Sequence, residues 1–586
     1  MTEDPFAHLH DERYADRYAA SRVGHATMLH IGGRRRIPLG GQWHFTPDLF
    51  DEGLRQRWFA DPPLPPERWD RPRDADLWGA ELTPVPGCWT CARPESRYFE
   101  GGGWYARRFG WNGESPRLVL RVGAANYEAR VFLNGVFLAA HRGGSTPFCV
   151  ELTQHVRTGD NHLVIQVDNR RRPERVPMHH FDWFNHGGLY REVELLPLPA
   201  VFIRQLEVSL AEHGVAVTIR LSDPVAGAAE VSLPGLGVTA PVPISEGVGR
   251  ATIPARLERW SPASPHLHDI AARFGADAVT DRVGLRTIEV RGEQIVLNGA
   301  PVYLRGICVH EDDAVLGKTT TEADLRRRFA HARELGCNLL RLAHYPHHER
   351  AAEIADEQGV MLWEEIPVYW AIDFANPETY ADAENQLLEL IARDRNRASV
   401  VLWGVGNENA DTDARYAFMS ELAQAARRAD PTRLVVAACL INRQAFRIED
   451  RLAAHLDVIG LNEYFGWYEP DFTGLERLLE NSRPGKPVVI SETGADAVAG
   501  LHGGPGTLFT EECQAEVYRR QIEIAARAAY VRGFCPWLLY DFRSERRQTG
   551  YQRGFNRKGL IAEDKQTTKL AFHVLAEHYR TLARAP

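Results

Sequence analysis

The 586-residue chain has no run of about 18 uninterrupted apolar residues, the length that a membrane-spanning helix needs. Its first stretch, MTEDPFAHLHDERYADRYAASR, is charged and lacks the apolar core of a signal peptide. An excess of one charge sign is also missing, because 69 basic and 78 acidic residues are mixed along the chain and give a formal charge of −9. We therefore expect a cytoplasmic protein that binds neither membranes nor nucleic acid and takes a small neutral or anionic ligand.

Cysteine is scarce, with eight residues that lie mostly inside apolar runs, as reduced core thiols do. Cys88 and Cys91, in CWTC, have the spacing of a redox or zinc motif, but no helix start or second ligand pair accompanies them. The histidine-rich segments HYPHHER and MHHFDWFNH lack the cysteine or carboxylate spacing that completes a tetrahedral metal set. We predict no metal and no cofactor.

The first half of the chain has the pattern of antiparallel β-sheets. Between residues 35 and 197, alternating runs such as EARVFLNGVFLAA are separated by Asn-Gly, Gly-Gly and proline. The same pattern continues over residues 198–288, about the length of one immunoglobulin-like sandwich. We predict a β-sandwich with an N-terminal extension over residues 1–197 and an immunoglobulin-like domain over residues 198–288.

After Arg286 the pattern changes, because short apolar strands alternate with amphipathic segments that are typical of crossover helices. Eight strands are predicted, in the order VYLRGICVH, NLLRLAH, VMLWEEI, VVLWGVGNE, LVVAACL, VIGLNEY, VVISE and FCPWLLYDF. This alternation predicts a (β/α)8 TIM barrel over residues 289–586, with its active site at the C-terminal ends of the strands. Polar side chains gather there: His310, Glu311, Arg341, His344, Glu364, Glu365, Asn407, Glu408, Asn462, Tyr464, Glu492, Trp537 and Asp541.

Two of these carboxylates have the placement that glycosidic-bond cleavage requires. Glu408 leaves a buried strand, and desolvation raises a carboxyl pKa toward the value that a proton donor needs near neutrality. Glu492 lies at the corresponding height of another strand, where we expect Arg341 and Tyr464 to keep it charged, as a nucleophile requires. We predict Glu408 as the acid/base and Glu492 as the nucleophile of a retaining reaction, with carboxyl groups about 5–5.5 Å apart. Asn407 would contact the hydroxyl beside the reacting carbon.

The segments GGGWYARRF, DWFNHGGLYREVEL, RLAHYP, VVLWGVGNEN, LNEYFGWY and ISETGADAVAGLH occur in this order. With them, the chain from about residue 35 onward resembles glycoside hydrolase family 2, and within it the β-glucuronidases. The resemblance implies that the first domain is a sugar-binding jelly roll and that the protein is a homo-oligomer. It also implies that Asp182 reaches the pocket from the jelly roll and restricts cleavage to chain ends. The supporting sugar contacts that it implies are Asn407, His310, His344, Tyr464 and Trp537.

Recognition of a uronic acid is predicted from the segment FNRKGL. Residues two apart in an extended chain point the same way, so Asn556 and Lys558 are expected to meet the C6 carboxylate while Arg557 faces elsewhere. This Asn-x-Lys triplet is similar to the carboxylate-binding motif of β-glucuronidases. Arg553 is a further candidate contact, from a basic loop that also holds Arg543, Arg546 and Arg547.

Several alternatives remain open on these residues. Thr493 stands where many β-glucuronidases have an aromatic residue, which removes a ring from the pocket wall. The basic loop from Arg543 to Arg553 is interpreted either as a solvated loop, as a site for an acidic glycan, or as part of an altered C4 pocket that accepts galacturonide rather than glucuronide. A family 2 β-galactosidase or another neutral-sugar β-glycosidase keeps the mechanism, with Lys558 binding a hydroxyl instead. A non-catalytic carbohydrate-binding protein is disfavoured because a lectin has no need for paired acids. The natural glycan, the oligomeric order and the role of the basic loop are not determined by the sequence.

Overall fold

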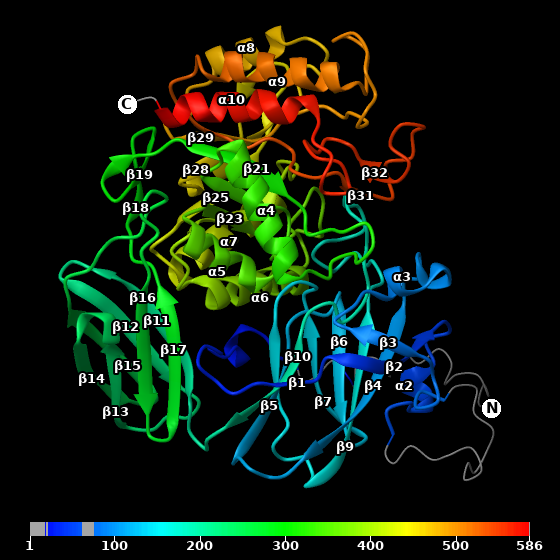
Figure 1. Cartoon of the computed structure of the whole chain (residues 1–586), viewed down its shortest axis with the longest axis vertical. Helices are drawn as coiled ribbons and strands as arrows, with labels where there is room; N and C mark the ends of the chain where they lie inside the picture. Colours follow the sequence, from blue (N-terminus) through cyan, green and yellow to red (C-terminus); the bar gives the residue numbers. More distant parts are fainter. Residues whose placement is uncertain (1–17, 19–21, 61–75, 585–586) are drawn as a thin grey trace.

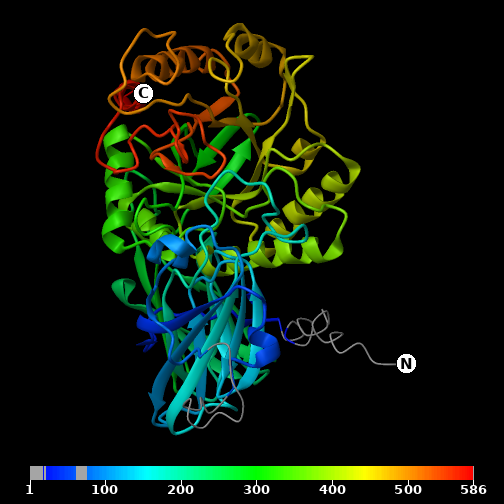
Figure 2. The ribbon, with the colours of Figure 1, turned by 90° about the vertical axis from the view of Figure 1, so that its right-hand side faces the viewer.

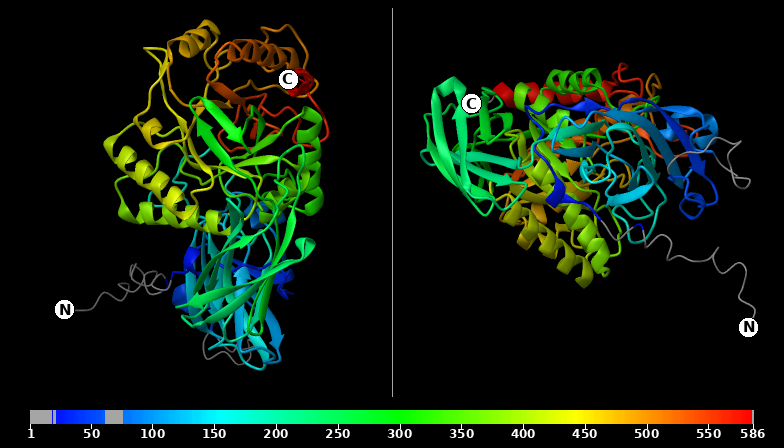
Figure 3. Two further views of the ribbon diagram at one scale, coloured as in Figure 1. Left: turned by 90° about the vertical axis from the view of Figure 1, so that its left-hand side faces the viewer. Right: turned by 90° about the horizontal axis from the view of Figure 1, so that it is seen from below.

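The computed structural model describes residues 18, 22–60 and 76–584. The charged N-terminal stretch, apart from Tyr18 and Arg22, lies outside these described residues. The barrel occupies one end of the molecule, and two β domains lie side by side at the other end (Figure 1; Figure 3, right). Among the described helices, none has the length and apolarity to cross a membrane.

The first domain consists of two antiparallel sheets that pack around one core. The larger sheet has the order β3 (Leu82–Val85), β2 (Gly41–Asp48), β4 (Gly102–Trp111), β9 (Gly159–Asp168), β6 (Glu128–Leu133) and β7 (Val136–Arg142). The smaller sheet has the order β1 (Ile37–Pro38), β10 (Val193–Leu198), β5 (Arg117–Val122) and β8 (Phe148–Glu151). The short helical turns are η2 (His25–Thr27), α2 (Gly53–Gln56), α3 (Trp89–Ala92) and η4 (Pro94–Ser96). The inward residues of both sheets are buried and apolar, as alternation predicts.

The second domain is a seven-stranded antiparallel sheet that encloses its own apolar core. Its order is β11 (Ile203–Ala211), β12 (Gly214–Leu221), β15 (Val248–Pro254), β14 (Val238–Ser245), β13 (Gly227–Leu233), β16 (His268–Phe274) and β17 (Asp277–Val283), with a short turn η5 (Pro234–Leu236). A small sheet then leads into the barrel and consists of β18 (Ile288–Arg291), β19 (Gln294–Leu297) and β20 (Ala300–Pro301).

The predicted TIM barrel is confirmed by a closed ring of eight parallel strands. The strands are β21 (Leu304–Val309), β22 (Leu339–Leu342), β23 (Met361–Glu365), β24 (Val400–Asn407), β25 (Leu434–Cys439), β28 (Val458–Asn462), β29 (Val488–Glu492) and β30 (Val531–Phe534). The helices around it are α4 (Glu322–Leu335), α5 (Glu349–Gln358), α6 (Pro377–Asp394), α7 (Asp413–Ala429), α8 (Thr473–Asn481), α9 (Glu511–Ala525) and α10 (Leu570–Arg584). Between β25 and β28 the chain forms only the hairpin β26 (Ile441–Asn442) and β27 (Arg447–Ile448) and the turn η6 (Arg451–His455).

Capping residues set the limits of the barrel helices. Thr321 accepts a hydrogen bond from the Asp324 backbone while the Asp324 side chain bonds back, which is a capping box at the start of α4. The same helix ends at Gly336, whose φ of 84° is in the left-handed region that glycine adopts without strain.

The eighth strand differs from its prediction. The run FCPWLLYDF was predicted as this strand, but β30 ends at Phe534, where the run begins. The residues that follow are buried at the barrel mouth, where Cys308 donates its backbone N–H to Pro536 O at 3.0 Å. Cys535 also donates its backbone N–H to Ile490 O at 2.7 Å, so the segment keeps backbone hydrogen bonds to both neighbouring strands although it does not continue β30 as a regular strand. The preceding helix α9 ends at Ala525, and residues 526–530 connect it to β30.

Candidate active site

Arg341 joins the ends of four barrel strands at the centre of the mouth. It belongs to β22 and is 0% exposed. Its guanidinium donates to Glu365 at 3.0 Å, to Glu492 at 2.8 Å and to Asn407 Oδ1 at 2.8 Å. Burial opposes ionisation of Glu365, but Arg341 and His344 outweigh it and lower the pKa of that carboxyl. One buried cation thus fixes the positions of three polar side chains from β23, β24 and β29.

Glu492 is the last residue of β29 and is 5% exposed. Arg341 donates to its Oε1, and the Tyr464 hydroxyl donates to its Oε2 at 2.9 Å. His344 Nε2 lies 3.7 Å from the same Oε1. Donors on both oxygens hold the carboxylate in one orientation, which is what a nucleophile in a rigid site needs.

Glu408 follows β24 with φ of 53°, in the left-handed region that a non-glycine residue seldom adopts. Its Oε2 accepts a hydrogen bond of 2.7 Å from Trp370 Nε1. Burial, together with the nearby charge of Glu492, raises the pKa of Glu408, and the Trp370 bond offsets part of that rise. The two predicted carboxylates are therefore close enough to influence each other, and their surroundings differ as an acid and a nucleophile require.

Two buried nitrogen atoms at the mouth have no hydrogen-bond partner among the described residues. One is Asn407 Nδ2, whose amide oxygen is already bound by Arg341 and Asn462. The other is His310 Nε2, whose ring bonds Tyr345 through Nδ1 at 3.1 Å. Burial and the neighbouring His344 lower the pKa of His310 well below its ordinary value, so the ring is neutral. Both nitrogens are available to a ligand's hydroxyl groups.

Aromatic rings form one wall of the site. Trp537 stacks on His344 with centroids 4.9 Å apart and meets His310 edge-on at 5.1 Å. Trp183, from the loop between β9 and β10, packs against Tyr369 at 5.0 Å. Burial and the charges of Asp182, Glu408 and Glu492 raise the pKa of Tyr369 well above its ordinary value.

Asp182 comes from the first domain, whose loop rises onto the barrel (Figure 2). Its carboxylate accepts hydrogen bonds from Ser544 at 2.5 Å, from Asn556 at 3.4 Å, and from Nε and Nη2 of Arg547. Burial opposes ionisation of Arg547, but Asp182 outweighs it and raises the pKa of Arg547. The jelly-roll loop and the loop after β30 are thereby joined at the edge of the pocket.

Lys558 is 1% exposed and points toward the same edge. Its Nζ lies 2.7 Å from Asp496 Oδ2 and donates to the Tyr468 hydroxyl at 2.9 Å. It also lies over the rings of Tyr468 and Tyr464, 4.7 and 5.6 Å from their centroids. Tyr464 bonds Glu492, so a single aromatic residue separates this ammonium from the nucleophile. Arg557 turns away to Asp541 and Glu563, as the alternation of the segment predicts.

The structure does not bring Arg553 to this group. The residue is exposed, and its Nε donates to Gly550 O at 2.9 Å. Arg547, from the same loop, is the arginine that reaches Asp182 and also donates to the Tyr468 hydroxyl at 2.9 Å. No local pattern in the sequence separates these two arginines. It also did not single out Asp496, which follows Glu492 by four residues and supplies the carboxylate for Lys558.

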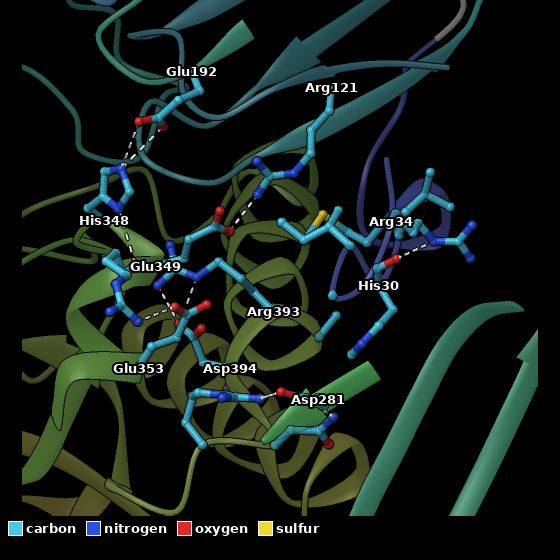
Figure 4. A pocket seen from close by; sticks show the side chains of 18 of the residues that line it. His30, Arg34, Arg121, Glu192, Asp281, His348, Glu349, Glu353, Arg393 and Asp394 are labelled. Atoms are coloured by element: carbon cyan, nitrogen blue, oxygen red, sulfur yellow. Dashed lines mark hydrogen bonds and ion pairs between the residues drawn. The ribbon is translucent and has the colours of Figure 1, made fainter. Parts of the chain in front are cut away.

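A separate cavity of about 740 Å³ lies between the first domain, the second domain and the side of the barrel (Figure 4). Its charged side chains pair with one another: Arg121 with Glu349, His348 with Glu192, Arg397 with Asp281 and Arg393 with Asp394. Arg121, His348 and Arg397 are therefore paired with carboxylates of another domain, and Arg393 is paired with the next residue of α6. The two nitrogens at the barrel mouth, in contrast, have no partner among the described residues. Within the described ranges, no cluster of three or more His, Cys, Asp or Glu residues is arranged to hold a metal ion.

Comparison with protein families assigns both functional domains. Residues 288–583 match the TIM barrel domain of glycosyl hydrolases family 2, and residues 37–199 match the sugar binding domain of that family. The chain belongs to glycoside hydrolase family 2 and is a glycoside hydrolase, as predicted.

Within this family the chain is most like the β-glucuronidases. It is 29% identical to a β-glucuronidase from Paenibacillus borealis, over 94% of this chain and 97% of that protein. A β-glucuronidase structure from an uncultured Clostridium species has a TM-score of 0.82 and 27% identity, covering 94% of this chain and 98% of the other. A family 2 β-galacturonidase from Eisenbergiella tayi has the same TM-score of 0.82 and 26% identity, with coverage of 94% and 97%.

Proposed function

We propose that this chain is a retaining exo-β-glycosidase that releases a terminal β-linked uronic acid. Glu492 attacks the anomeric carbon while Glu408, protonated, donates its proton to the departing oxygen. The ionised Glu408 then takes a proton from water, which attacks the glycosyl-enzyme ester and releases the sugar with its β configuration. Trp370 holds the Glu408 carboxyl, and Arg341 with Tyr464 holds the Glu492 carboxylate.

The sugar's hydroxyl groups have donors ready in the free enzyme. Asn407 Nδ2 lies on the residue before Glu408, so we assign it to the hydroxyl beside the reacting carbon. His310 Nε2 takes a second hydroxyl, and Trp537 presents a ring to the sugar face. A donor that is buried and unpaired before substrate arrives forms its bond without first losing another, which favours binding.

The position of Lys558 is the observation that most favours a uronic acid as the sugar. A buried carboxylate needs a cation and further donors, and Lys558 Nζ lies beside the Tyr468 hydroxyl and the Arg547 guanidinium. Asn556, bonded to Asp182, adds an amide at the same edge. A neutral sugar offers no charge that would use this arrangement.

The choice between glucuronide and galacturonide turns on Asp182. In the free enzyme its carboxylate already accepts hydrogen bonds from Ser544, Asn556 and Arg547, so a sugar hydroxyl has to compete with these three donors for it. The likeness to the Eisenbergiella tayi β-galacturonidase supports galacturonide as the second candidate. The loop that carries Asp182 covers one side of the pocket, which supports cleavage at chain ends.

The test compares 4-nitrophenyl β-D-glucuronide, β-D-galacturonide and β-D-galactoside with the wild-type enzyme. We expect turnover of at least one uronide in preference to the galactoside. Glu408→Gln and Glu492→Gln should each lower turnover by several orders of magnitude, whereas Glu480→Gln, an exposed acid on α8, should leave it unchanged. Preference for the galactoside, or full activity in either of the first two variants, would reject the proposal.

A further inference from the structure

Arg546 lies on the acid/base side of the site. Its guanidinium carbon is 4.7 Å from the ring centroid of Trp370, and Trp370 Nε1 donates to the Glu408 carboxyl. Because Glu408 protonates the departing oxygen, the aglycone leaves from this side of the pocket. Arg546 is therefore connected to the leaving group through a single aromatic side chain.

No carboxylate among the described residues pairs with the charge of Arg546. The residue is exposed and forms no ion pair with a carboxylate of the described chain. Two neighbouring arginines of the same loop already have partners. Arg547 binds Asp182, and Arg543 donates to the backbone oxygen of Ala314. Stacking on an indole ring holds a guanidinium in place while its N–H edge stays free to donate.

We propose that Arg546 recognises a carboxylate on the aglycone, which makes the enzyme selective for acidic leaving groups. This inference rests on the proposed uronidase activity and extends it to the group on the other side of the scissile bond. The carboxylate belongs either to the next uronic acid of a glycan or to a small acidic aglycone. In both cases a guanidinium fork fits it, and the flat face of Trp370 supports the ring that carries it.

The experiment compares kcat/KM for two uronides that differ in charge only at the aglycone, the 4-carboxyphenyl and the 4-carbamoylphenyl β-uronide. In Arg546→Gln the ratio of acid to amide should fall about fivefold, the size expected for one exposed ion pair. Comparing the ratio between enzymes cancels the different acidities of the two phenols. Arg519→Gln, which removes one exposed charge on α9, should leave the ratio at the wild-type value.

The outcomes separate this inference from the function on which it rests. Normal turnover of the amide with the same ratio in wild type and Arg546→Gln overturns the role of Arg546 alone. Failure of the wild type to cleave either uronide contradicts the proposed activity and with it this inference. Raising the salt concentration should reduce the wild-type ratio, because an exposed charge pair is screened. A linear β-linked diuronide, assayed in both enzymes, then shows whether a sugar carboxylate gives the same discrimination as the small acid.

Discussion

Replacing Lys558 with methionine tests how the pocket selects a charged sugar. The ammonium is buried, with Nζ 2.7 Å from Asp496 Oδ2 and 2.9 Å from the Tyr468 hydroxyl. Burial opposes the charged form, but Asp496 outweighs it and raises the pKa of Lys558, so the group is a cation over the whole working range. Methionine keeps the length of the side chain and removes the charge.

The expected loss of activity is estimated from the ion pair between Lys558 and the substrate carboxylate that the variant removes. Truncating one partner of a buried, hydrogen-bonded charge pair costs about 2–5 kcal/mol of binding. With a factor of ten for about each 1.4 kcal/mol, kcat/KM for the preferred uronide should fall about 30- to 4,000-fold. Turnover of a neutral glycoside should change far less, because its C6 group carries no charge to lose a partner.

Asp496, the partner of Lys558 in the wild type, affects the result of the single variant and can be replaced in a control variant. In Lys558→Met the Asp496 carboxylate stays buried without its cation and repels the substrate carboxylate. The double variant Lys558→Met, Asp496→Asn removes that repulsion and should recover part of the lost uronide activity. Lys565→Met, which breaks the 2.8 Å pair with Asp313 outside the pocket, should keep the wild-type preference.

The assay measures kcat/KM for the 4-nitrophenyl uronide and the matching neutral glycoside, with thermal unfolding recorded for each variant. If uronide and neutral turnover fall in the same proportion, or if uronide turnover is unchanged, Lys558 does not bind the sugar carboxylate.

Three further outcomes follow from the site. Trp370→Phe removes a hydrogen bond that favours the ionised form of Glu408, so the pKa of Glu408 should rise further. Because catalysis needs Glu408 protonated, the basic limb of the pH profile of kcat/KM should move to higher pH. A shift to lower pH would contradict the assignment of Glu408 as the acid. Glu408→Ala should lower kcat about 10²- to 10⁴-fold for a substrate with a poor leaving group, and far less for a 2,4-dinitrophenyl glycoside. Added azide should restore turnover of the 2,4-dinitrophenyl glycoside and give a glycosyl azide as the product. Arg341→Met leaves the buried carboxylates of Glu365 and Glu492 without their cation. The free energy of unfolding, measured in urea, should therefore fall by about 3–5 kcal/mol. Unchanged stability would mean that the ion pairs of Arg341 contribute little.

The sequence predicted the barrel because its signal is local. Apolar strands, amphipathic helices and polar residues at each strand end occur in order along the chain, and the closed ring of eight strands confirms that reading. The error at FCPWLLYDF has a physical cause, since burial at the barrel mouth selects the same residue types as strand pairing does.

The contacts that complete the pocket are distant in sequence and left no local pattern. Asp182 and Arg547 are 365 residues apart, and Lys558 and Asp496 are 62 apart. The composition predicted a basic loop but not the role of each arginine. In the structure Arg547 binds Asp182 and Arg546 lies over Trp370. Arg553 reaches neither of these partners and donates to Gly550 O. The role of Trp370 as the donor to Glu408 was likewise not predicted from the sequence.

In the proposed mechanism Glu492 forms a covalent bond to the sugar, and Glu408 donates a proton to the departing oxygen and later takes one from water. A 2-deoxy-2-fluoro-β-uronyl fluoride destabilises the transition states but keeps a good leaving group, so the glycosyl-enzyme should accumulate. Peptide mass spectrometry should then find the fluorosugar on Glu492 and nowhere else. A label on another carboxylate, or no label together with an inverted first product in proton NMR, would contradict the mechanism.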